Sequence, residues 1–147
     1  MTLIVRIQEE LETAMRERDA TRRDTLRLIL ANLRSAEKEL RRELNDQEEL
    51  QVLQRERKKR VEAFEAFEAA GREEQADKED FELEVLEEFM PDPLSEEELD
   101  EIVDDVIAEV GATSLRDIGR VMADVMPRVS GKADGSAVSQ IVREKLA

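Results

Sequence analysis

The residues that could do chemistry gather in one short stretch near the C-terminal end. Gly131, Lys132 and Gly135 stand in the segment SGKADGS, between two stretches with the apolar spacing of helices. Glycines allow another backbone to approach closely, and a helix starting after Gly135 presents free backbone N–H groups and its positive dipole end. This combination suits a phosphate. An ordinary turn, with both glycines left-handed and Asp134 or Ser136 capping the helix, fits the same residues.

No recognisable active site accompanies this segment. The sequence has no His and no Cys, which removes the commonest general base, the thiol nucleophile and the usual transition-metal ligands. A Walker-type phosphate loop needs Gly five residues before Gly131, where this chain has Met126, and Ser or Thr after the lysine, where it has Ala133. Carboxylates stand in runs such as EEEL, which are typical of solvated helix faces. We therefore expect no catalytic residue, no metal site and no cofactor.

The chain is strongly acidic, but its charge is uneven. Its 147 residues have a net charge of −15. Residues 111–147 hold six basic and four acidic residues, an excess of two positive charges, so residues 1–110 carry −17. A negative chain is poorly suited to indiscriminate binding of nucleic acid or anionic membrane. The C-terminal stretch is the one sizeable part without a large negative excess.

Two basic clusters lie within the acidic part. Arg23, Arg27 and Arg34 recur at helical spacing on one face, and RERKKR places five basic residues at 55–60. Because acids outnumber bases roughly two to one here, we expect salt bridges to neighbouring carboxylates, each worth about 0.2–0.5 kcal/mol, rather than RNA binding.

Helical periodicity runs through the chain, and no strand alternation accompanies it. The prolines Pro91 and Pro93 exclude a continuing helix and mark a boundary between domains 1–90 and 94–147. The first domain is expected to hold about four helices: 3–18 capped by Thr2, a second over 26–45, a third from a capping box of Asp46 and Glu49 to Gly71, and a fourth ending before MPDP.

The second domain is expected to be a three-helix bundle, which makes the fold class all-α. Its first helix is capped by Ser95 with Glu98 and ends at Gly111. The second begins near Ser114 and is stopped by Pro127, and the third begins near Ser136. In the second helix, Gly119 lowers helix stability by about 1 kcal/mol relative to alanine. We expect that a glycine stands there because another helix packs closely against it.

The sequence has no apolar run of the length that a membrane span requires, and its N-terminal apolar stretch is too short for a signal peptide. The absence of cysteine agrees with a reducing compartment. We expect a soluble, cytoplasmic protein.

The hinge FMPDPLSEEEL and the following IGRVMADVMPRVSGKADGSAVSQIV resemble the YqeY family. The second segment is also similar to the C-terminal module of GatB, a subunit of the glutamine-dependent aspartyl/glutamyl-tRNA amidotransferase. The order of elements matches as well, so the resemblance covers essentially the whole chain. Family members often carry a basic residue where this chain has Ser130. The positions that match the motif are the candidate nucleic-acid-binding residues: Gly119, Arg120, Arg128, Gly131, Lys132 and Gly135.

The resemblance implies tRNA binding, or assistance to an amidotransferase, without chemistry of its own. The expected partners are tRNA, amidotransferase subunits or an aminoacyl-tRNA synthetase, and no membrane. Two alternatives stay open. In the first, the chain is an acidic adaptor that docks a basic translation or amidotransferase partner. In the second, it is a glutamine-dependent carbon–nitrogen ligase. The ligase rests on family similarity alone, because the sequence offers neither a nucleophile nor a nucleotide site for it.

Overall fold

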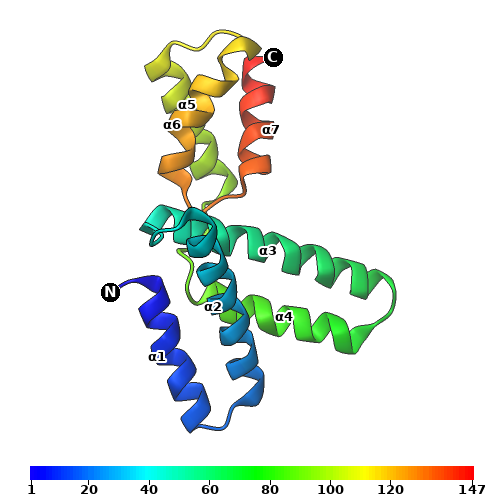
Figure 1. Ribbon diagram of the computed structural model, residues 1–147. Coiled ribbons are helices and arrows are strands. Elements are labelled where there is room, and N and C mark those ends of the chain that lie inside the picture. The colour runs from blue at the N-terminus through cyan, green and yellow to red at the C-terminus, as the bar shows by residue number, and fades with distance from the viewer. The chain divides into compact units, whose positions relative to one another are not determined.

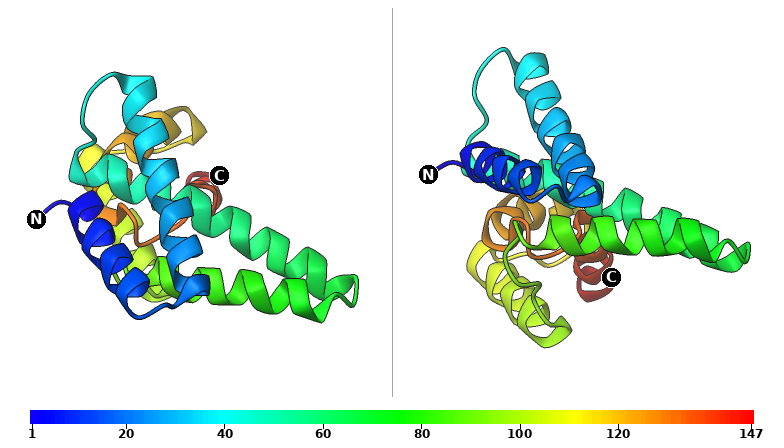
Figure 2. Two further views of the ribbon diagram at one scale, coloured as in Figure 1. Left: turned by 60° about the horizontal axis from the view of Figure 1, so that its bottom comes forward. Right: turned by 90° about the horizontal axis from the view of Figure 1, so that it is seen from below.

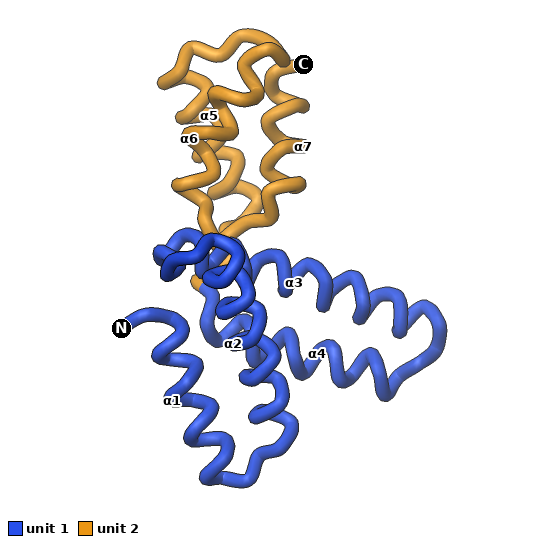
Figure 3. Tube along the Cα trace, in the orientation of Figure 1, with its two compact units in different colours: residues 1–90 blue, residues 91–147 orange.

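The computed structural model describes residues 1–147 and consists of α-helices and one short 3-10 helix, without strands (Figure 1). The all-α class predicted from the apolar spacing is confirmed. The chain divides into two compact units, Met1–Met90 and Pro91–Ala147 (Figure 3). None of the helices is both long and apolar enough to cross a membrane.

Unit 1 is built from two helical hairpins (Figure 2). Helix α1 (Leu3–Arg16) packs against α2 (Ala20–Leu40), and α3 (Asp46–Ala69) packs against α4 (Glu73–Glu87). Helix α2 also contacts α3 and α4, which joins the hairpins. The apolar stripes of all four helices meet in one core: Ile7, Ala14, Leu26, Ile29, Leu33, Leu53, Val85, Leu86 and Phe89.

The helix ends of unit 1 differ from the prediction in two ways. The capping box of α3 uses Asn45 and Glu48, one residue before the predicted pair, because Glu49 is buried and its Oε2 accepts a hydrogen bond from the Ile4 backbone N–H at 3.3 Å. Helices α1 and α2 end earlier than expected, each in a turn whose left-handed residue is an arginine, Arg18 with φ 59° and Arg41 with φ 56°. Such turns normally carry glycine, so the sequence contained no stop signal there.

Arg42 and Glu48 link the end of α2 to the start of α3. The Arg42 guanidinium donates to both carboxylate oxygens of Glu48, at 2.7 and 2.8 Å, and the Asn45 N–H donates at 3.1 Å. The Arg42 hydrogen bonds, followed by that of Asn45, lower the pKa of Glu48 from 4.5 to about 2.

We expect Glu48→Gln to lower the free energy of unfolding in a pH-dependent manner. A carboxyl with a depressed folded pKa stabilises the fold above its unfolded pKa, and this contribution is lost as pH falls through the folded pKa. The difference between wild type and Glu48→Gln should therefore be full above pH 4.5 and shrink towards pH 2. Urea unfolding of both proteins at a series of pH values measures this difference in the free energy of unfolding. A difference that is constant with pH would contradict a lowered pKa of Glu48.

A charged network between α3 and α4 uses part of the RERKKR cluster. The Arg60 guanidinium pairs with Glu82, with Glu79 at 3.2 Å and with Glu56 at 3.9 Å. Glu82 is buried, and this burial raises its pKa although Arg60 acts in the opposite direction. Among the remaining four bases, Arg57 and Lys59 also form ion pairs, whereas Arg55 and Lys58 form none.

We expect Arg60→Ala to lower the free energy of unfolding by about 3 kcal/mol, because it leaves carboxylates within the hairpin without their counter-ion. Arg57→Ala is the matched control. It breaks an exposed pair with Glu87 and should cost less than about 1 kcal/mol. Chemical unfolding of both variants compares them, and equal losses would show that the Arg60 network behaves as an ordinary surface pair.

Unit 2 contains α5 (Glu96–Val110), the 3-10 helix η1 (Leu115–Asp117), α6 (Ile118–Val129) and α7 (Gly135–Leu146). As predicted, the Ser95 side chain caps α5 by accepting from the Glu98 N–H at 3.1 Å, and Gly111 ends it with φ 67°. The predicted capping box is only half formed, because the Glu98 side chain accepts no hydrogen bond from the Ser95 N–H. The buried core combines valines and leucines from α5, α6 and α7: Leu99, Val103, Val106, Val121, Val125, Val129, Val138, Val142 and Leu146.

The prediction that Pro127 stops the second helix of this unit is wrong. Pro127 lies inside α6, which continues to Val129. A proline inside a helix costs about 3 kcal/mol. Full burial of a valine recovers about 1.5–3 kcal/mol, and both Val125 and Val129 are 0% exposed. Packing of this face therefore carries the helix past the proline.

Candidate nucleic-acid interface

The six candidate residues do not form one cluster, because α6 separates them into two groups. Gly119 and Arg120 lie in the first turn of α6, Arg128 lies in its last turn, and Gly131, Lys132 and Gly135 follow its last residue. Helix α6 has 12 residues, so its ends are about 18 Å apart. Figure 1 shows the loop before α7 and the η1 segment at opposite ends of α6.

Arg120 closes the connection between α5 and α6. Its guanidinium donates to Asp117 Oδ1 at 2.8 Å and to the Val110 carbonyl oxygen at 3.2 Å. The Thr113 N–H and then Arg120 lower the pKa of Asp117, which keeps this carboxylate charged. The Arg120 side chain is thus engaged within its own unit.

Arg128 is directed at α5 and forms an exposed ion pair with Glu109. This hydrogen bond raises the pKa of Arg128, and Asp124 and Asp105 add to the effect. The guanidinium therefore faces a group of carboxylates. A phosphate would have to compete with them for Arg128.

The loop between α6 and α7 is held by its backbone. Gly131 has φ 72°, the left-handed conformation that glycine accepts without strain. The Lys132 N–H donates to the Val129 carbonyl at 2.8 Å, and the Lys132 carbonyl accepts from the Leu94 N–H at 2.9 Å. The Lys132 side chain is exposed and forms no ion pair.

The first turn of α7 has no side-chain cap, which differs from the alternative interpretation of this segment as an ordinary turn capped by Asp134 or Ser136. Asp134 occupies the N-cap position, but its Oδ2 accepts from the Ser136 hydroxyl instead of from the backbone. Gly135 is not left-handed, and a Cβ there would lie 3.6 Å from Met126 Cε, an ordinary contact. The N–H groups of this turn are left without a side-chain acceptor.

The structure also decides which bases of unit 2 are neutralised. The unit holds thirteen acidic and six basic residues. Arg120 and Arg128 are paired as described, and Lys145 pairs with Asp100 at 3.0 Å and Asp104 at 2.8 Å. The bases without an ion pair are Arg116, Lys132 and Arg143. Sequence reasoning could not separate these from the paired ones, since most of the partner carboxylates lie on α5, far away in the sequence.

Gly119 does not serve close packing, which corrects the prediction. It is exposed on α6, and a Cβ built there would meet no heavy atom within 4 Å. The helix therefore has a glycine where its own unit would tolerate alanine.

We expect Gly119→Ala to raise the free energy of unfolding by about 0.5–1 kcal/mol, because alanine reduces the conformational entropy of the unfolded chain and favours the helix. Thermal and urea unfolding measure the gain. Gly131→Ala is the contrasting variant and should destabilise, since φ 72° is strained for alanine. Destabilisation by Gly119→Ala would show an unrecognised packing constraint.

Comparison with known proteins gives two findings. A family model described as Yqey-like protein matches residues 4–146. The chain is also 29% identical over 145 residues to a protein of Pyrenophora tritici-repentis named altered inheritance of mitochondria protein 41, mitochondrial. This match covers 97% of the chain and 80% of that relative. The relative's name assigns it to mitochondria, whereas the cytoplasmic location expected for this chain stays a prediction.

Proposed function

Because the chain belongs to the YqeY family, we propose that it binds tRNA without catalysing a reaction, as an accessory of an amidotransferase or an aminoacyl-tRNA synthetase. One observation carries the proposal. The first turn of α7 has no side-chain cap, and the loop directly before it holds Lys132, a cation without an ion pair.

These groups together suit a backbone phosphate. The first N–H groups of a helix have no partner within it, and the positive end of the helix dipole favours an anion. Lys132 precedes that turn by only a few residues, and Gly131 lacks a Cβ that would hinder a sugar–phosphate chain. The nearest competing carboxylate, Asp134, accepts from Ser136 and leaves these N–H groups open.

The composition of unit 2 sets the mode of binding. All four phenylalanines lie in unit 1, so unit 2 has no aromatic side chain on which a base could stack. Contact would therefore be made with phosphates and with the shape of a folded RNA. Because the unit as a whole is acidic, such contact would be confined to Lys132 and to the N-terminal end of α7.

We expect the purified chain to retain tRNA on a filter at low salt, with an affinity that falls linearly on a log–log plot against salt. Lys132→Glu should weaken retention about tenfold, because it replaces a phosphate-binding cation by an anion. Arg116→Glu is the matched control. It changes the net charge equally at the opposite end of α6 and should have a much smaller effect.

Two results would contradict the proposal: no retention at low salt, or equal retention by wild type and Lys132→Glu. A basic protein partner that stays bound after nuclease treatment, together with no retention of tRNA, would favour the adaptor alternative. Glutaminase activity of the purified chain would favour the ligase alternative.

A further inference from the structure

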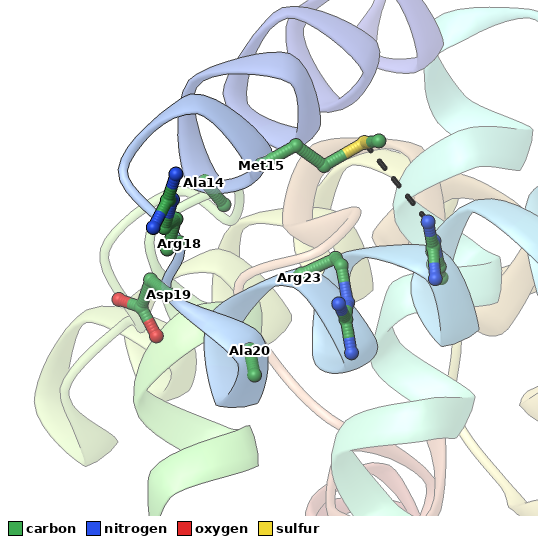
Figure 4. A pocket seen from close by; sticks show the side chains of 7 residues that line it. Ala14, Met15, Arg18, Asp19, Ala20 and Arg23 are labelled. Atoms are coloured by element: carbon green, nitrogen blue, oxygen red, sulfur yellow. Dashed lines mark hydrogen bonds between the residues drawn. The ribbon is translucent and has the colours of Figure 1, made fainter.

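A second basic site lies in unit 1, at the turn that joins α1 to α2 (Figure 4). A partly open pocket of about 200 Å³ lies at this turn. Three of its lining side chains are arginines, and two are alanines, which leave room between the helices. The lining residues are Ala14, Met15, Arg18, Asp19, Ala20, Arg23 and Arg27.

The backbone of the turn brings the arginines together. Arg23 and Arg27 stand four residues apart, on one face of α2. Arg18 is added from the turn, where hydrogen bonds from the Arg18 N–H to Met15 O at 3.2 Å and from the Asp19 N–H to Ala14 O at 2.9 Å close the end of α1. This closure holds Arg18 at φ 59°, a conformation that glycine adopts without strain and arginine does not. Strained residues of this kind concentrate at functional sites.

The charges of these arginines are poorly neutralised. Arg18 and Arg27 form no ion pair, and the contact made by Arg27 within the pocket is with Met15 Sδ at 4.0 Å. Arg23 pairs at 3.0 Å with its chain neighbour Asp24, whose side chain is 66% exposed. The sequence-based expectation that the cluster at 23–34 forms salt bridges is therefore wrong for Arg27, and also for Arg34.

The neighbouring charged groups do not neutralise the positive charge of the pocket. Arg22 is held by Glu10 at 3.2 Å and Glu88 at 2.7 Å, and it does not line the pocket. Asp19 does line it, but its Oδ1 accepts from the Arg22 backbone N–H at 3.1 Å as the cap of α2. Three arginines and one aspartate thus line the pocket, in a chain whose net charge is −15.

We propose that this pocket binds the phosphate group of a phosphorylated ligand. Guanidinium groups bind phosphate through paired, charge-assisted hydrogen bonds. The pocket is smaller than the roughly 300–1,000 Å³ of sites that enclose a drug-sized molecule. It therefore admits the phosphate while the rest of the ligand stays outside. The phosphate can belong to a small phosphorylated molecule or to the 5′ end of an RNA, and the site is separate from the α7 site of unit 2.

The test is a calorimetric titration of inorganic pyrophosphate into the full chain carrying Lys132→Glu, so that the loop before α7 does not contribute. We expect saturable binding of one pyrophosphate that weakens with salt. Arg27→Gln should weaken it about tenfold. Arg34→Gln, the matched control on the same helix, removes a cation without an ion pair outside the pocket and should leave binding unchanged. No saturable binding, or equal effects of both variants, would overturn the proposal.

A second pair of variants separates ligand binding from folding. Arg18→Gly and Arg41→Gly each relieve a left-handed arginine, so both should raise the melting temperature. Only Arg18→Gly removes a lining side chain, and only this variant should lose affinity for pyrophosphate. Undiminished binding by Arg18→Gly would overturn the three-arginine site.

Competition then distinguishes the two sources of the phosphate. Displacement of pyrophosphate by a 5′-phosphorylated RNA oligomer, but not by the same oligomer with a 5′-hydroxyl, assigns the site to an RNA end. Displacement by a sugar phosphate alone assigns it to a small molecule. Displacement by neither would contradict a site for phosphate esters.

Discussion

Burial of the valine face of α6 is the constraint on which unit 2 depends. Val121, Val125 and Val129 are 0% exposed and pack against α5 and α7. Because Val129 must stay in this core, α6 continues past Pro127 and the chain reverses only at Gly131. That reversal places Lys132 directly before α7. The candidate phosphate site is therefore a consequence of apolar packing, and it would move if α6 ended at the proline.

Ion pairs decide which cations of this acidic chain remain available. Arg120, Arg128 and Lys145 are neutralised by Asp117, by Glu109 and by Asp100 with Asp104. In unit 1, Arg60 is enclosed by carboxylates of α3 and α4. The cations that remain unpaired include Lys132 beside the open turn of α7 and two arginines of the α1–α2 pocket. Net charge alone would not have suggested anion binding in unit 1.

The two proposed sites depend on the same backbone feature. In both, a left-handed residue closes a turn and leads into a helix, Gly131 before α7 and Arg18 before α2. Glycine makes the first turn free of strain and visible in the sequence. Arginine makes the second strained, and it adds a charge at the point where the chain reverses.

The sequence by itself determined the all-α class, the cap at Ser95 and the end of α5 at Gly111, because these depend on residues near one another in the chain. The family motifs around 119–135 were also readable from it. Only the tertiary structure decided that α6 passes Pro127, that Gly119 packs against nothing and that α7 starts without a side-chain cap. It alone showed that Arg18 joins Arg23 and Arg27 at one pocket. These features follow from burial and from charge pairing between distant segments, which local spacing does not encode.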